Sequence, residues 1–269
     1  MTPAALEPIA TAVDRWRADA GRPLVVGLCG AQGSGKSTIA AALVEQLQSR
    51  GIAAVALSLD DLYLTHAERA RLAAEVHPLL ATRGVPGTHD VGLGNAVLDA
   101  LVAGRATALP RFDKSRDDRA PRDEWPLSPG GIQVIVFEGW CVGARPQPRE
   151  ALTTPVNTLE RHEDPDGRWR AYVNAALAGS YQGLFARIDR LVLLAAPSFA
   201  VVERWRGQQE AELRRTAPAG TALMDEAALR RFIQHYERLT RHILAEMPQR
   251  ADLFVALTPE REVAAVRSR

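Results

Sequence analysis

Residues 30–37 (Gly-Ala-Gln-Gly-Ser-Gly-Lys-Ser) match the phosphate-binding pattern G-x-x-x-x-G-K-[ST] at every required position. Glycines let the backbone N–H groups turn inward around phosphates, and the N-terminus of a following helix adds positive partial charge. We expect Lys36 to contact the β- and γ-phosphates of ATP and Ser37 to help hold Mg²⁺. The predicted ATP-binding residues are Gly30, Ala31, Gln32, Gly33, Ser34, Gly35, Lys36, Ser37 and Thr38.

Two further apolar runs lead into acidic residues. Asp60 and Asp61 follow the run Ala53–Leu59, and Glu138 follows Val134–Phe137. Ligands bind at the carboxyl edge of parallel sheets, so these acids are candidates for chemistry. Asp60 is the predicted catalytic base for a hydroxyl, Asp61 a substrate-binding residue and Glu138 a metal-side carboxylate. The alternatives are a helix-capping aspartate and a solvated glutamate at a strand end.

Cations and hydroxyls occur together in two polar segments, Arg83–Asp90 and Pro110–Arg119. Both segments are suited to bind a small anionic or polyhydroxylated substrate. They yield the candidate substrate-binding residues Arg83, His89, Asp90, Lys114 and Arg119, to which Tyr63 is added. Ordinary exposed charge is the competing explanation for any one of them. Arg204 and Arg206 are predicted to close over the phosphates as catalytic residues, with an amphipathic surface helix as the alternative.

The elements that must position these residues alternate along the chain. Continuous rather than alternating hydrophobicity predicts strands covered on both faces, as in a parallel sheet. Predicted strands are Leu24–Cys29, Ala53–Leu59, Val134–Phe137, Leu191–Ala195 and Leu253–Leu257, and predicted helices are Ala5–Ala18, Ser37–Ser49, Gly94–Val102, Trp169–Phe185, Phe199–Arg215 and Asp225–Glu246.

The expected fold class is α/β, a doubly wound, mostly parallel sheet of the P-loop NTPase type. We expect a single domain over residues 1–269, with an irregular substrate-loop region at 83–129 and a helical lid at 198–215. Residues 160–169, which contain the turn Asp164–Gly167, are expected to form a surface excursion.

Composition excludes several classes of protein. With 269 residues, 46% of them hydrophobic, the chain can build its core without disulfides, and its two cysteines, Cys29 and Cys141, argue against a cysteine-rich metal site. Lys+Arg 33 against Asp+Glu 32 leaves a formal charge of +1, so we expect no nucleic-acid or membrane partner. The first 19 residues contain no unbroken apolar run, and the expected compartment is the cytoplasm.

Several motifs taken together are more specific than the phosphate loop alone. GAQGSGKST, LSLDDLYLT, RGVPGTHD, LPRFDKS, VIVFEGW and VERWRGQQE, in this order, resemble the D-glycerate 3-kinase family of the uridine kinase and phosphoribulokinase group. The resemblance implies a P-loop kinase that uses ATP and Mg²⁺ to phosphorylate D-glycerate to 3-phosphoglycerate. By the same resemblance Asp60 matches the base, Glu138 the metal-side glutamate, and Arg204 and Arg206 the lid.

Two other functions compete with this one. A uridine-, pantothenate- or pentose-type kinase has the same fold and the same phosphate loop. A non-catalytic P-loop switch is the second alternative, although the chain has no Asn/Thr-Lys-x-Asp element for reading guanine.

Overall fold

The computed structural model describes residues 4–216 and 225–269, so residues 1–3 and 217–224 of the predicted 1–269 domain lie outside this description. In the described part, the main sheet has six strands in the order β10-β9-β8-β1-β7-β2. All neighbours run parallel except β10, which is antiparallel to β9. The strands are β1 (Leu24–Gly30), β2 (Ala54–Ser58), β7 (Val134–Gly139), β8 (Arg190–Ala195), β9 (Leu253–Leu257) and β10 (Val263–Ser268). The predicted mostly parallel sheet is confirmed.

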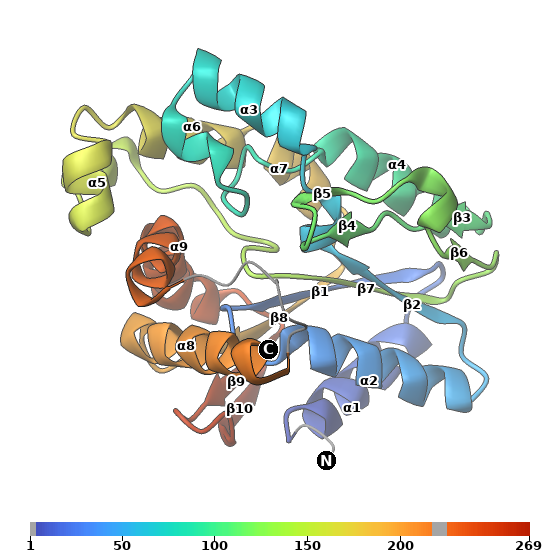
Figure 1. Cartoon of the computed structure of the whole chain (residues 1–269). Helices are drawn as coiled ribbons and strands as arrows, with labels where there is room; N and C mark the ends of the chain where they lie inside the picture. Colours follow the sequence, from blue (N-terminus) through green and yellow to red (C-terminus); the bar gives the residue numbers. More distant parts are fainter. Residues whose placement is uncertain (1–3, 217–224) are drawn as a thin grey trace.

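Helices cover both faces of this sheet (Figure 1). They are α1 (Leu6–Ala18), α2 (Lys36–Ser49), α3 (His66–Glu75), α4 (Val91–Val102), α5 (Thr158–Glu163), α6 (Arg168–Ala178), α7 (Ser180–Phe185), α8 (Phe199–Thr216) and α9 (Glu226–Glu246). Within the described ranges, no helix combines the length and the apolar character needed to cross a membrane.

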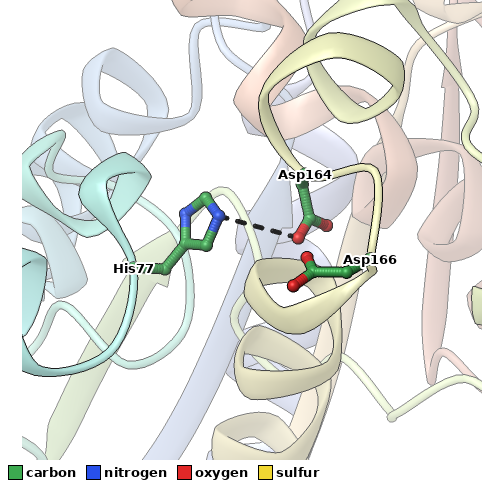
Figure 2. Close-up of side chains that lie close together, drawn as sticks. All are labelled: His77, Asp164 and Asp166. Atoms are coloured by element: carbon green, nitrogen blue, oxygen red, sulfur yellow. Dashed lines mark ion pairs between the residues drawn. The ribbon is translucent and has the colours of Figure 1, made fainter.

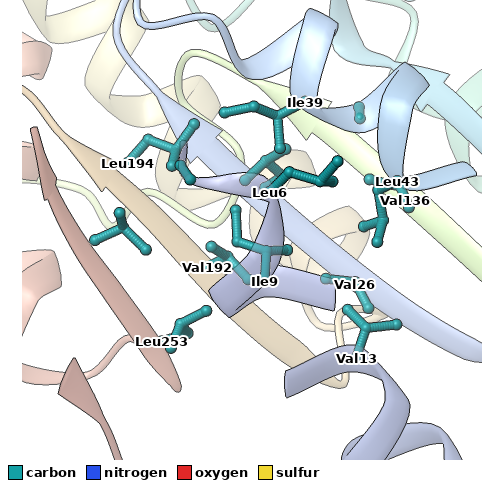
Figure 3. Packing of buried hydrophobic residues seen from close by; sticks show 14 of the residues in the cluster. Leu6, Ile9, Val13, Val26, Ile39, Leu43, Val136, Val192, Leu194 and Leu253 are labelled. Carbon is teal, nitrogen blue, oxygen red and sulfur yellow. The ribbon is translucent and has the colours of Figure 1, made fainter. Parts of the chain in front are cut away.

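Among the described residues, a large apolar core lies on each face of the main sheet. On one face α1, α2 and α8 pack against the sheet, and Figure 3 shows Ile9 of α1 and Ile39 of α2 meeting strand residues such as Val192. On the other face α4, α7 and α9 pack against the opposite side chains of the same strands. Every residue of β1 and β7 is buried, which explains why both strands are apolar without alternation.

The carboxyl ends of β1, β7 and β2 lie side by side. Cys29 of β1 is level with Gly139 of β7, and Ser58 of β2 is level with Glu138. A short 3₁₀ turn, η1 (Leu59–Leu62), follows β2 directly and carries the two adjacent aspartates. The phosphate loop, the aspartates after β2 and Glu138 near the end of β7 therefore meet at one edge, as predicted.

Two sequence predictions about local structure are wrong. The single helix predicted over Trp169–Phe185 is two helices, because Gly179 adopts φ −92° and ψ −112° and ends α6 before α7 begins. The stretch 160–169 is not a surface excursion throughout, since Glu160 and Asp164 are fully buried.

The region 83–129 contains more regular structure than its composition indicates. Beside α4, it forms two small antiparallel pairs, β3 (Thr107–Ala108) with β6 (Leu127–Ser128), and β4 (Phe112–Asp113) with β5 (Asp118–Arg119). The β4–β5 hairpin packs against η1. Residues 112–119 are therefore held next to the aspartates at the sheet edge.

Candidate functional site

The phosphate loop links β1 to α2 in a tight turn. Gly33 and Gly35 have φ angles of 78° and 84°, in the left-handed region that favours glycine. A side chain at Gly33 would also collide with the backbone-proximal part of α8, since an added Cβ would lie 2.5 Å from the Cβ of Trp205. The loop is thus shaped for backbone contact with a ligand and is packed directly against α8.

A cavity of about 460 Å³ opens beside this loop. It is lined by Gln32, Gly33, Lys36, Ser37, Asp60, Tyr63, Arg83, Lys114, Arg206, Gln209, Phe232 and Tyr236. Nine of these residues were predicted from the sequence as ATP, metal, catalytic or substrate residues. The other predicted loop residues, Gly30, Ala31, Ser34, Gly35 and Thr38, build the turn without lining the cavity.

Asp60 is the acid inside this cavity. Its Oδ1 accepts a hydrogen bond from the Tyr63 hydroxyl at 2.8 Å, and its Oδ2 accepts one from Lys114 Nζ at 3.0 Å. Burial acts to raise the pKa of Asp60, but the charges of Lys114 and Lys36 and the two hydrogen bonds outweigh it and hold the pKa well below its usual range. Asp60 is therefore an ionised hydrogen-bond acceptor at neutral pH.

Glu138 lies next to the phosphate loop and has an unused oxygen. The Ser37 hydroxyl donates to its Oε1 at 2.9 Å, and the residue is 4% exposed. The other oxygen, Oε2, is buried and has no hydrogen-bond partner among the described residues. A buried, unpartnered carboxylate oxygen beside a serine hydroxyl is suited to a hard divalent cation or to its coordinated water.

Besides Glu138 and the loop residues named above, five predicted site residues do not line the cavity, because each is engaged in the scaffold around it. Asp61 accepts from Phe112 N and from Arg111 Nη1, both at 3.0 Å, and so fastens the β4–β5 hairpin. Asp90 caps α4 by accepting from Leu93 N at 2.9 Å, and its other oxygen accepts from Arg119 Nη2 at 3.2 Å. The structure does not bring Asp61, Asp90 or Arg119 to the cavity surface.

His89 and Arg204 complete this group. The His89 ring stacks on Tyr63 with centroids 4.6 Å apart, and its Nδ1 lies 2.6 Å from the Tyr181 hydroxyl. Burial lowers the pKa of His89 to about 3, against the opposing effect of Asp60. Arg204 points to the β9–β10 turn, where Nη2 donates to Pro259 O at 3.1 Å. His89 thus supports Tyr63, while Arg206 is the arginine of the pair that reaches the cavity.

Three lining residues, Gln209, Phe232 and Tyr236, were not predicted. The Tyr236 hydroxyl donates to Arg83 O at 3.0 Å, and its ring meets Trp140 edge-on with centroids 4.9 Å apart. Phe232 and Tyr236 are spaced four residues apart on α9, which places both on one face of the helix. That spacing was visible in the sequence, but it is also the ordinary pattern of a core-facing helix.

A second acidic group lies away from the cavity. Figure 2 shows His77, Asp164 and Asp166 converging, with His77 Nε2 3.8 Å from Asp164 Oδ1. His77 Nδ1 accepts a hydrogen bond from Leu79 N, so the ring proton of the neutral form is on Nε2 and faces Asp164. Asp164 also accepts from the backbone N–H of Trp169 at 2.8 Å and pairs with the Arg170 guanidinium at 2.8 Å. This hydrogen bonding makes the group a cap for α6 rather than a metal site.

Comparison with known proteins gives partial and full-length matches. A family model described as methylmalonyl Co-A mutase-associated GTPase MeaB matches residues 4–62, the part with the phosphate loop and Asp60. Over 225 residues the chain is 40% identical to the uncharacterized kinase mug58 of Schizosaccharomyces pombe, covering 80% of this chain and 79% of that protein.

Two further similar proteins are D-glycerate 3-kinases by name. The chain is 32% identical over 243 residues to the chloroplastic D-glycerate 3-kinase of Arabidopsis thaliana, covering 86% of this chain but 50% of the plant protein. The solved structure of D-glycerate 3-kinase from Cryptococcus neoformans superposes with a TM-score of 0.81 at 26% identity, covering 99% of both chains.

Proposed function

We propose that this chain, which belongs to the D-glycerate 3-kinase family of P-loop kinases, transfers the γ-phosphate of ATP to the primary hydroxyl of D-glycerate and so forms 3-phosphoglycerate. One observation carries the proposal. The cavity that holds Lys36 of the phosphate loop also holds the ionised Asp60 and three more cations, Arg83, Lys114 and Arg206. A site for a phosphate donor together with an anionic, hydroxyl-bearing acceptor needs this combination.

The nucleotide occupies the phosphate loop in this proposal. Lys36 contacts the β- and γ-phosphates, while the backbone N–H groups at the start of α2 face their oxygens. The residues present fit Mg²⁺, because Ser37 and the unpartnered Oε2 of Glu138 offer oxygen ligands directly or through water. When bound, Mg²⁺ neutralises charge on the phosphates that are transferred and released.

Asp60 orients the acceptor. The glycerate hydroxyl donates its proton toward Asp60 while its oxygen attacks the γ-phosphorus, the bond to the β-phosphate oxygen breaks, and ADP leaves. Arg83 and Lys114 hold the glycerate carboxylate, and Arg206 stabilises the charge of the transferred phosphoryl group. Asp61, His89, Asp90 and Arg119 act behind the cavity wall as supports for these groups.

An ADP-coupled assay over an acceptor panel tests the proposal. D-glycerate is compared with uridine, pantothenate and pentoses, and we expect D-glycerate to give the highest kcat/KM. A higher value for a nucleoside or a sugar would assign the chain to that kinase class, and ATP binding without turnover of any acceptor would favour a nucleotide switch. The cytoplasmic location predicted from the sequence stays a prediction.

The Asp60→Asn variant tests the mechanism separately. Loss of the proton acceptor is expected to lower kcat by a factor of about 100 or more. Asparagine has the same size as aspartate, so a melting temperature close to that of the unaltered protein shows that the loss is not unfolding. Full turnover of the best acceptor by this variant would remove Asp60 from its assigned role.

A further inference from the structure

We propose that Lys114 covers Asp60 until the carboxylate of an acceptor draws it away, so that anionic acceptors are selected over neutral polyols. This inference rests on the proposed function and assigns substrate selection to one residue. The contact that carries it is the pair between Lys114 Nζ and Asp60 Oδ2 at 3.0 Å, formed inside the cavity that both residues line.

The pair uses the oxygen that an incoming hydroxyl needs. The buried Tyr63 hydroxyl holds Asp60 Oδ1, and Lys114, which lines the cavity, holds Oδ2, so an acceptor hydroxyl that approaches Oδ2 meets the ammonium group of Lys114 there. A lysine ammonium held against a carboxylate also makes that carboxylate a poorer proton acceptor. Movement of Lys114 away from Asp60 therefore opens the hydrogen-bonding position and raises the basicity of Asp60 in one step.

Lys114 is the cation in this cavity that can move at low cost. Its side chain is 60% exposed and lies between the two strands of the β4–β5 hairpin. Because the ammonium group reaches solvent and would exchange one carboxylate partner for another, replacing Asp60 by a substrate carboxylate keeps the charge of Lys114 paired. Arg83, by contrast, is 25% exposed, pairs with Asp117 and has its guanidinium carbon 5.4 Å from the centre of the Phe112 ring.

Asp60 itself stays in place during the exchange. Tyr63, which donates to it, is 3% exposed and is held between the rings of His89 and Phe112, with centroids 4.6 and 5.2 Å away. The carboxylate thus keeps its orientation when the lysine leaves. Glycerol has a primary hydroxyl but no carboxylate, so it offers Lys114 no alternative partner and competes poorly for Asp60.

The hairpin offers a matched control for the test. Arg116 is 61% exposed and its Nε lies 3.0 Å from Asp113 Oδ2, so it resembles Lys114 in charge, exposure and pairing. It does not line the cavity. Lys114→Met and Arg116→Met each remove one exposed positive charge from the same hairpin, and only the first uncovers Asp60.

The experiment measures kcat and KM for D-glycerate and for glycerol at saturating ATP in the unaltered protein, Lys114→Met, Lys114→Arg and Arg116→Met. A charged hydrogen bond to the carboxylate is worth about 1.5–3 kcal/mol, which corresponds to a factor of about 10–150. For Lys114→Met we expect the preference for glycerate over glycerol in kcat/KM to fall by this factor, through a higher KM for glycerate and an equal or higher kcat/KM for glycerol. Lys114→Arg retains most of the preference, and Arg116→Met retains all of it.

The possible failures are distinguishable. An unaltered protein that phosphorylates glycerate, with the same preference in Lys114→Met, overturns the inference and leaves the proposed function intact. Equal losses on both acceptors in Lys114→Met also overturn it, since Lys114 would then act on the phosphates or on the fold. If the unaltered protein does not phosphorylate glycerate, the proposed function fails and the inference fails with it.

Discussion

Glu160 and Arg238 form a buried ion pair that joins α5 to α9, and its removal is expected to destabilise the protein strongly. Glu160 is fully buried and accepts from Arg238 Nε and Nη2, each at 2.7 Å. Glu160→Ala leaves the guanidinium buried without its counter-charge, although Arg238 keeps bonds to two backbone carbonyls. Removing one partner of a buried pair costs about 3–5 kcal/mol. For a chain of this size that corresponds to a fall in melting temperature of about 10 °C.

A second pair between the same two helices serves as the control. Glu163 of α5 accepts from Arg231 Nε of α9 at 2.8 Å, but the two side chains are 39% and 49% exposed. Because exposed pairs contribute about 0–1 kcal/mol, Glu163→Ala should shift the melting temperature by a few degrees at most. Urea unfolding and thermal melting of both variants measure the difference. Equal destabilisation by the two substitutions would refute the argument that burial sets the cost.

Two further predictions concern the phosphate loop and pH. Arg261 donates to Gly33 O at 2.6 Å, and its guanidinium lies 5.1 Å from the centre of the Trp205 ring. Arg261→Ala should therefore raise the KM for ATP about tenfold with little change in kcat. An unchanged KM in ATP titrations would contradict this prediction. Burial lowers the pKa of His89 to about 3 and that of His235 to about 4, so below pH 6.5 the unfolded chain binds protons that the folded chain does not. The free energy of unfolding should therefore fall from pH 6.5 toward pH 4, by up to about 1.4 kcal/mol per pH unit for each histidine. Urea unfolding at pH 7, 6 and 5 measures this slope, which should be smaller in His89→Gln. A free energy of unfolding that does not change with pH would contradict the prediction.

Site residues whose position follows from a short motif or from the topology of the sheet could be predicted from the sequence. Gly33 and Lys36 lie within one short motif, and Asp60 and Glu138 lie at the carboxyl ends of parallel strands, which share an edge of the sheet. Tyr236 could not be predicted in the same way. Its hydroxyl contacts Arg83 across 153 residues of sequence, and nothing in an amphipathic helix distinguishes a residue that faces a cavity from one that faces the core.

The cations show why residue type alone does not identify ligand contacts. Arg119 and Lys114 both lie in the same charged segment and both appeared suited to bind an anion. In the folded chain Arg119 is paired with Asp90, the cap of α4, so its charge is used in holding the scaffold together. Lys114 is paired with Asp60 inside the cavity, so the partner it would release is the proposed catalytic base. Arg119 and Asp90 are 29 residues apart in the sequence, and Lys114 and Asp60 are 54 residues apart. These distant partners, and not residue type, therefore decide which cation can respond to a substrate.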